Sequence, residues 1–159
     1  RHVAGNRFSD YVFRKLKPGD IVSLTGPGGR FTLNEGSPRA LIFLAHGTGF
    51  APIKSLIEHA MARDTAESLH LYWIAGADNH YLDNHCRAWA DALDNFQYTP
   101  LTVEATGMQP ALEQIAQDHS DLGGFDIYAA GPGDFLNSAE KFLRDKKFPP
   151  DQLRTERVD

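Results

Sequence analysis

The stretch that decides the fold is AHGTGFAP, residues 45–52. An apolar run at residues 40–45 leads into it, and a helical pattern with one apolar face follows at residues 52–61. Two glycines therefore stand where a buried strand turns into a helix. Pro52 suits the first helical turn, because a backbone N–H at that point has no partner within the helix. The stretch predicts a βα unit with a tight turn at its centre.

Further βα units follow along the chain. Strand patterns recur at residues 69–75, 98–103, 125–129 and 152–158. Helical patterns lie between them, at residues 82–93, 110–119 and 134–145. Strands that alternate with helices are typical of a parallel sheet that is covered on both faces. We therefore expect an α/β fold, doubly wound, with a mainly parallel five-stranded sheet and helices on both faces.

The first part of the chain has a different character. Up to about residue 37 the segments are short and rich in turns, and short strands are expected at residues 21–24 and 30–33. This pattern is typical of the end of an all-β unit. We expect two domains, with the end of an antiparallel β-barrel at residues 1–37 and the α/β domain at residues 38–159.

Composition excludes several classes of function. The formal net charge is −5 and the basic residues are scattered, which argues against nucleic acid or an acidic membrane as a partner. The single cysteine, Cys86, excludes an internal disulfide and an iron–sulfur cluster held by cysteines of this chain alone. No apolar run reaches the ~18 residues of a membrane span, and the first residues lack the apolar core of a signal peptide. We expect a soluble, cytoplasmic protein.

The glycine turn after the first strand favours phosphate binding. Glycines let the backbone approach a ligand closely, and the N-terminus of the next helix adds a partial positive charge. A second glycine turn, at residues 131–133, follows the fourth strand at the same edge of the expected sheet. Ligands of open α/β sheets bind at this edge, where the strand order reverses. The alternative is that the glycines serve only turn geometry, with Asp134 as a helix cap.

Other residues with chemical potential have simpler interpretations. His80, His85 and Cys86 lie close together, but a spacing of five does not place the two histidines on one helix face. We interpret them as surface histidines and a buried cysteine, with no metal site. No serine lies in a nucleophile elbow, so acyl transfer has no support. Trp73 and Trp89 are interpreted as core residues.

Two motifs together carry a family resemblance. GTGFAP at residues 47–52, followed by YAAGP at residues 128–132, resembles the paired signatures of the ferredoxin–NADP reductase superfamily. The matching branch contains the reductase components of phenol hydroxylases and dioxygenases and CDP-6-deoxy-glucoseen reductase. The opening GNRFSDYVF, residues 5–13, is similar to the end of that family's flavin barrel. The resemblance implies an oxidoreductase in which NAD(P)H gives hydride to FAD, which passes electrons to an iron–sulfur centre or another acceptor.

The resemblance also implies which residues form the site. Thr48 and Glu156 are the implied catalytic residues, and Gly5 and Ser9 are the implied contacts to FAD. The implied contacts to the nicotinamide dinucleotide are His46, Gly47, Thr48, Gly49, Phe50, Pro52, Ala130, Gly131 and Pro132. The family's earlier flavin motif is absent, so FAD would be bound largely by residues outside this chain. The implied partners are the rest of the flavin barrel and a 2Fe–2S ferredoxin domain or another electron-acceptor protein.

The sequence departs from the family at three positions near the reaction centre. His46 stands where glycine or serine is usual, Ala130 replaces a common cysteine, and Val158 replaces a terminal aromatic residue. These departures leave an alternative open, a non-catalytic nucleotide-binding or regulatory module derived from such a reductase.

Three expectations about behaviour follow from the motifs. The loop after the second strand contains Asp78 and lacks the arginine that is frequent in the family, with Arg87 expected two turns into the next helix. This charge balance favours NADH over NADPH, unless Asp78 only caps that helix. Gly49→Val should weaken dinucleotide binding and leave the fold intact. The chain by itself should be colourless.

Overall fold

The computed structural model describes residues 2, 5–23, 25–26, 28–64, 66–76, 79–103 and 108–158. The chain divides into two compact units, Arg1–Arg30 and Phe31–Asp159. The larger unit contains the whole β-sheet.

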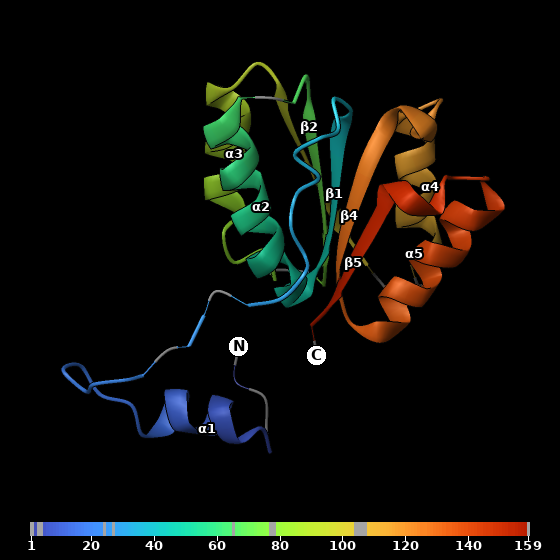
Figure 1. Cartoon of the computed structure of the whole chain (residues 1–159). Coiled ribbons are helices and arrows are strands. Elements are labelled where there is room, and N and C mark those ends of the chain that lie inside the picture. Colours follow the sequence, from blue (N-terminus) through green and yellow to red (C-terminus); the bar gives the residue numbers. More distant parts are fainter. Residues whose placement is uncertain are drawn as a thin grey trace. The chain divides into compact units, whose positions relative to one another are not determined.

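A five-stranded sheet forms the centre of the larger unit, and every neighbouring pair of its strands is parallel. The order across the sheet is β3-β2-β1-β4-β5 (Figure 1). The strands are β1 (Ala40–His46), β2 (Leu69–Ala75), β3 (Phe96–Thr102), β4 (Phe125–Gly131) and β5 (Leu153–Arg157). The expected doubly wound α/β fold is confirmed, and each strand begins within two residues of its predicted start.

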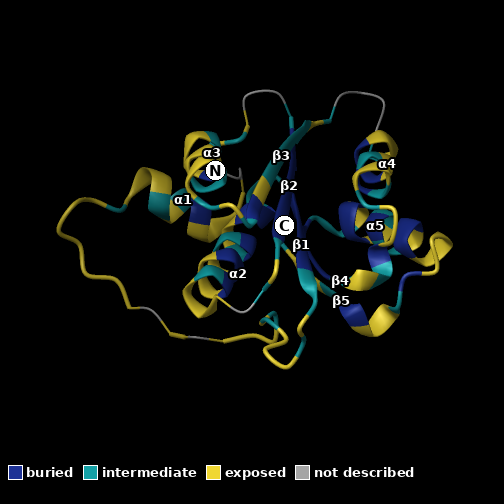
Figure 2. Ribbon diagram, turned by 90° about the horizontal axis from the view of Figure 1, so that it is seen from above, coloured by how far each residue is buried: buried dark blue, intermediate teal, exposed yellow. Residues whose placement is uncertain are grey.

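Helices cover both faces of this sheet, as Figure 2 shows. α2 (Phe50–Arg63) and α3 (Asp83–Ala92) pack on one face, and α4 (Gln109–Asp118) and α5 (Gly133–Asp145) pack on the other. Each pair of helices encloses its own apolar core against the strands. Within the described ranges, no helix has the length and apolar character needed to cross a membrane.

The central strands are buried on both faces. All of β2 and residues 41–45 of β1 are buried, because helices cover both sides of the sheet. This explains why both strands are continuously apolar in sequence. α2 adds the buried side chains Phe50, Ile53, Leu56, Ile57 and Ala60. Burying each of the larger ones contributes about 1.5–3 kcal/mol, which fixes α2 over β1.

The strand order reverses between β1 and β4. After β1 the chain crosses to β2 on one side, while β4 lies on the other side of β1. The connections that leave β1 and β4 therefore enter helices on opposite faces, α2 and α5. Such a switch point leaves a crevice outside the carboxyl ends of the strands. Both glycine turns lie at this edge.

The smaller unit contains one helix among its described residues, α1 (Arg7–Arg14). The Asn6 side chain caps it by accepting a hydrogen bond from the Ser9 N–H at 2.9 Å. The strands predicted at 21–24 and 30–33 are wrong, because the described residues there pair with no other segment. Several large apolar side chains of this unit are exposed, namely Phe8, Tyr11, Phe13, Ile21 and Val22.

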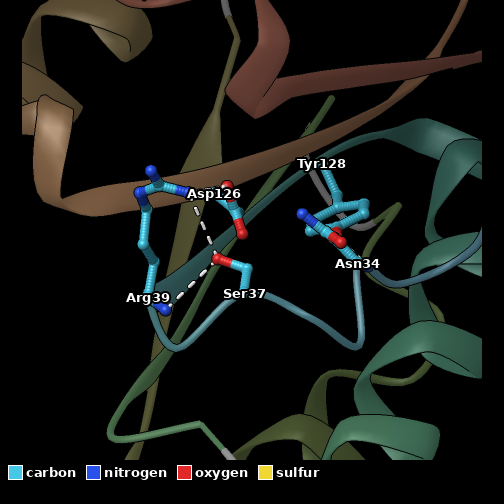
Figure 3. Close-up of polar contacts among 5 residues, drawn as sticks. All are labelled: Asn34, Ser37, Arg39, Asp126 and Tyr128. Atoms are coloured by element: carbon cyan, nitrogen blue, oxygen red, sulfur yellow. Dashed lines mark hydrogen bonds and ion pairs between the residues drawn. The ribbon is translucent and has the colours of Figure 1, made fainter.

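The segment that leads into β1 is fixed on the sheet of the larger unit (Figure 3). The Asn34 N–H donates a hydrogen bond to the Tyr128 hydroxyl at 2.8 Å. Arg39 forms an ion pair with the buried Asp126 at 3.4 Å. Phe31 packs against the same core as α2. These contacts explain why the larger compact unit includes the segment from Phe31 to β1.

Candidate functional site

The first glycine turn is a short 3-10 helix, η1 (Gly47–Gly49), between β1 and α2. Gly47 has a φ of +55°, in the left-handed region that favours glycine. A Cβ atom at this position would meet no atom within 4 Å. The Trp73 indole N–H fixes the turn by donating to the Gly47 carbonyl oxygen at 3.1 Å. Gly47 therefore combines a backbone conformation suited to glycine with open space at the edge of the sheet.

Gly49 has a different role in the same turn. Its Cβ would lie 2.1 Å from the Ala130 carbonyl oxygen and 2.8 Å from the Gly131 nitrogen. The obstacle is the backbone of β4, so no rotamer change could make room for a side chain. The expectation that Gly49→Val leaves the fold intact is therefore wrong, because valine would force η1 away from β4.

The second glycine turn lies directly beside the first. β4 ends at Gly131, Pro132 follows, and α5 begins at Gly133. A Cβ at Gly131 would lie 2.9 Å from the His46 Cβ and 2.8 Å from the Phe135 ring. The structure thus brings the two motifs together at one edge of the sheet, although they are far apart in sequence.

His46 is the last residue of β1, and its ring is turned toward α5. The ring stacks on Phe135, with the centroids 5.4 Å apart and the planes 24° apart. Burial lowers the pKa of His46 below its ordinary value, so the imidazole is neutral near pH 7. Its Nδ1 is buried and has no hydrogen-bond partner among the described residues. The imidazole ring of His46, which stands where glycine or serine is usual, is therefore packed against α5.

An aromatic cluster supports the first turn on the α2 face. Phe50 is 0% exposed and stacks on Trp73, with the ring centroids 4.0 Å apart. Its side chain belongs to the core, so a ligand could contact only the main chain of Phe50. Tyr81 is 55% exposed and meets both rings edge-on. Tyr81 was not predicted as a site residue from the sequence. The available signal was an aromatic residue in the loop after β2.

Thr48 and Pro52 stand close to the open position of Gly47. Thr48 is the middle residue of η1 and is half-buried. Pro52 is half-buried in the first turn of α2, where its missing N–H leaves no helical hydrogen bond unmade. The N-terminus of α2 contributes a partial positive charge beside this turn, which favours an anion.

The end of β5 lies beside the second turn. Glu156 aligns with Ala130 in the ladder between β4 and β5, and its side chain is exposed. The Val158 N–H donates to the Gly131 carbonyl oxygen at 3.0 Å. The Arg157 guanidinium carbon lies 3.4 Å from the position of a Gly133 Cβ. The topology thus places Glu156 at the same edge as η1 and adds Arg157, which was not predicted.

The residues that bear on the choice between NADH and NADPH are only partly described. Asp78 lies outside the described residues. Arg87 is bound by Asp83, with 2.6 Å between Nε and Oδ2, and the Tyr98 hydroxyl donates to the same carboxylate at 2.8 Å. The bond from Arg87 lowers the pKa of Asp83, and the Tyr98 bond adds to this effect. We expected Arg87 two turns into α3. Because α3 begins at Asp83, Arg87 is only one turn from the helix start.

The two residues implied to contact FAD lie in the smaller unit. Gly5 has a φ of +79°, and a Cβ there would meet no atom within 4 Å. Ser9 lies in the first turn of α1 and is buried. Both stand at the N-terminal end of this helix, a place where backbone N–H groups suit a phosphate.

His80, His85 and Cys86 have separate surroundings. His80 Nε2 lies 2.8 Å from the Trp73 carbonyl oxygen, and the His85 ring contacts Trp89. Burial raises the pKa of the Cys86 thiol to about 12, so the thiol stays protonated. Across the part of the chain that the structure describes, no group of three or more histidine, cysteine, aspartate or glutamate residues is placed to hold a metal ion.

Comparisons with known proteins agree with this geometry. Residues 43–141 match the family model of the oxidoreductase NAD-binding domain. The CDP-6-deoxy-L-threo-D-glycero-4-hexulose-3-dehydrase reductase of Yersinia pestis is 30% identical over 167 residues, which cover 94% of this chain and 50% of the relative. The reductase component of propane 2-monooxygenase from Mycolicibacterium goodii is 30% identical over 161 residues, covering 94% of this chain and 46% of the relative.

A solved structure shows the same fold. A cytochrome P450 reductase of Amycolatopsis matches with a TM-score of 0.84 at 24% identity, covering 99% of this chain and 50% of that one. The chain thus spans about half the length of the relatives that it matches.

Proposed function

Because the chain belongs to the oxidoreductase NAD-binding domain family of the ferredoxin–NADP reductase superfamily, we propose that it is the dinucleotide-binding part of a flavin-dependent reductase. NADH would give hydride to FAD, and the electrons would leave to an iron–sulfur centre or another acceptor. The observation that supports this most directly is the contact between two glycine turns at the switch point of a parallel sheet.

The residues at the crevice fit the diphosphate of a dinucleotide. Gly47 leaves open the space into which any other residue would project a side chain. The N-terminus of α2 stands next to it with its partial positive charge. We therefore assign Gly47 and Thr48 to the diphosphate, and Gly131 and Pro132 to the nicotinamide half. Gly49 and Ala130 keep the two turns in contact.

Thr48 and Glu156 are the proposed catalytic residues. Thr48 offers a hydroxyl that can both donate and accept a hydrogen bond, and Glu156 offers an exposed carboxylate beside Ala130. FAD, when bound, accepts hydride and releases electrons singly. The task left to these side chains is to orient the nicotinamide and exclude water from it.

The flavin is assigned mainly to residues outside this chain. Gly5 and Ser9 at the start of α1 are the proposed contacts that remain. Phe8, Phe13 and Ile21 are 76%, 58% and 96% exposed, and exposed apolar groups of this size mark a surface that another part of a protein covers. A flavin barrel joined to the smaller unit would supply this cover.

The proposed electron partner is a 2Fe–2S ferredoxin domain or a separate acceptor protein. Hydride carries two electrons, and a flavin can pass them singly to such a one-electron centre. The chain's one cysteine suits a reducing compartment, so we place the reductase in the cytoplasm.

The test compares this chain with the full-length natural protein. Anaerobic NADH should bleach the flavin absorption of the full-length protein, whereas the chain by itself should be colourless and bind NAD⁺ in calorimetry. Absence of dinucleotide binding would exclude the proposed function. A full-length protein whose flavin NADH does not reduce would favour a non-catalytic binding module. Ala130 and Val158, which replace a cysteine and an aromatic residue near the reaction centre, favour that alternative.

A further inference from the structure

Trp73 connects the core of the larger unit with the first glycine turn. It lies in β2, is 0% exposed and stacks on Phe50, with the ring planes 17° apart. The His80 ring contacts the indole edge-on, with the ring centroids 5.1 Å apart. Packing therefore fixes the direction of the indole ring, and its N–H donates to the Gly47 carbonyl oxygen at 3.1 Å.

The Gly47 carbonyl oxygen accepts two hydrogen bonds. Besides the indole N–H, the backbone N–H of Phe50 donates to it within the turn. These bonds hold the carbonyl group toward β2 and the start of α2. A trans peptide group is planar, and its C=O and N–H point in opposite directions. The orientation of the Gly47 carbonyl therefore also sets the orientation of the Thr48 N–H, which belongs to the same peptide group.

The Thr48 N–H consequently points away from Trp73 and toward the free N-terminal end of the helical turn. The first N–H groups of a helix have no hydrogen-bond partner inside it, which makes this end suitable for an anion. A carbonyl group that accepts hydrogen bonds polarises its peptide group, and this strengthens the N–H as a donor. An anion at the turn would thus meet an N–H whose direction and strength both depend on the indole.

We propose that Trp73 is a positioning residue for dinucleotide binding: its indole N–H holds the Gly47 carbonyl so that the Thr48 N–H donates to the diphosphate. This inference rests on the proposed function, because it needs a dinucleotide in the crevice. It extends that function by giving a side chain of the buried core a part in the affinity. The ring of Trp73 fills the core, as expected from the sequence, while its polar end acts on the turn.

Trp73→Phe tests the hydrogen bond, because phenylalanine keeps an aromatic ring beside Phe50 and lacks the indole N–H. Trp89→Phe is the matched control, since Trp89 is a half-buried tryptophan of α3 that packs on Phe96. Calorimetry measures the Kd for NAD⁺ and for ADP-ribose, and circular dichroism checks that each variant is folded. Trp73→Phe should raise both Kd values about tenfold, and Trp89→Phe should leave them within about twofold of the parent. A loss with NAD⁺ that ADP-ribose does not share overturns the proposal, because both ligands contain the diphosphate.

The amide NMR spectrum gives a readout that a purely structural role would not change. In the parent chain the Thr48 amide proton should move downfield when ADP-ribose binds, as expected for an N–H that donates to a phosphate oxygen. In Trp73→Phe at saturating ligand, this movement should be about half as large or smaller, because the N–H is no longer held in one direction. A Thr48 amide that does not respond in the parent overturns the proposal, and so does an equal response in Trp73→Phe.

An isosteric replacement keeps the test decisive if Trp73→Phe fails to fold. The chain has two tryptophans, so in a Trp89→Phe background a tryptophan analogue replaces Trp73 alone. Benzothienylalanine has the shape of tryptophan with sulfur in place of the N–H, and it should raise both Kd values about tenfold. Unchanged affinity in a folded protein with either replacement refutes the role of Trp73, as does an equal loss in Trp89→Phe. A parent chain that binds neither ligand refutes the proposed function itself.

Discussion

The sheet has one histidine at the amino edge, where its strands begin, and another at the carboxyl edge, where they end. The two differ in the hydrogen bonding of their ring nitrogens. At the amino edge, His70 places Nδ1 3.1 Å from His119 Nε2 and Nε2 2.8 Å from the Thr99 hydroxyl. At the carboxyl edge, the buried Nδ1 of His46 has no hydrogen-bond partner among the described residues. Burial lowers the pKa of both, and for His70 the nearby His119 adds to the effect.

The difference indicates that the amino edge of the sheet contributes to stability, whereas the carboxyl edge is suited to binding. Both nitrogens of His70 have side-chain partners, so this edge offers little to a ligand. The carboxyl edge keeps open space at Gly47, where a Cβ would meet no atom within 4 Å, while the unpaired Nδ1 of His46 is buried within the protein. Open space beside a backbone turn, and not the buried ring nitrogen, is therefore what this edge offers to a ligand.

The largest expected effect tests whether the two glycine turns at the carboxyl edge are packed against each other. Gly49→Ala should destabilise the protein by about 3 kcal/mol, at the upper end for inserting atoms into a packed interior, because the new Cβ meets the Ala130 backbone at 2.1 Å. Urea unfolding followed by circular dichroism measures the change. A loss below about 1 kcal/mol would mean that the two turns are not packed together.

The stability of the protein at acid pH tests the hydrogen-bonded group of His70, His119 and Thr99 at the amino edge. The pKa of His70 is lowered to about 4, so between pH 6.5 and 4 the unfolded chain binds a proton that the folded protein does not. The contribution of His70 is therefore complete above pH 6.5 and is lost as the pH falls toward 4, by roughly 2–3 kcal/mol.

The control for this prediction is His70→Gln, which can still bond to Thr99 but has no proton to gain. Its free energy of unfolding should fall less steeply with acid than that of the parent, in urea titrations at several pH values. Parallel curves for the two proteins would show that His70 is not held neutral by the fold.

A smaller effect on stability, with a clear effect on binding, is expected at Gly47. Gly47→Ala should lower the free energy of unfolding by about 1 kcal/mol, because alanine is disfavoured at a φ of +55°. The same methyl group projects into the space assigned to the diphosphate, so the affinity for NAD⁺ should fall roughly tenfold. Calorimetry and urea unfolding of the same sample distinguish the two effects. A variant that loses stability and keeps full affinity would place the dinucleotide elsewhere.

The smallest expected effect concerns the choice of cofactor. Asp83 holds Arg87, and Asp78 adds negative charge to the loop before α3, so NADH should bind about fivefold more tightly than NADPH at low salt. Asp78→Ala should reduce this preference, and Asn79→Ala serves as the neighbouring control. Equal or tighter binding of NADPH to the parent chain would reveal a cation that reads the 2′-phosphate.

The sequence predicted the strands and helices of the larger unit well because their patterns are local. The continuous apolar run of β2 and the one-sided pattern of α2 report burial directly. The rule that ligands bind at the switch point then placed both glycine turns at one edge. The helix α1 was missed, although Asn6 followed by Ser9 and Asp10 is the kind of cap that begins a helix.

The packing at the site that the sequence could not predict comes from contacts between residues that are distant in sequence. Gly49 looks like a ligand-facing glycine until the Ala130 carbonyl is found beside it. Phe50 looks exposed at a helix start until Trp73 is found stacked on it. Neither partner is near in the chain, so no local pattern could show that these positions are used for packing. The packing of His46 on Phe135 was hidden for the same reason.

The contact between Gly49 and the Ala130 backbone also bears on motion. Because two backbones already touch there, β1 and β4 cannot hinge toward each other when a cofactor enters, and the floor of the crevice behaves as one rigid piece. In the proposed reductase, exchange of NADH for NAD⁺ would then depend on groups above that floor, such as the exposed Tyr81 side chain. The turnover of the complete reductase would accordingly respond to changes in those covering parts, while the floor keeps the same shape in the empty and occupied states.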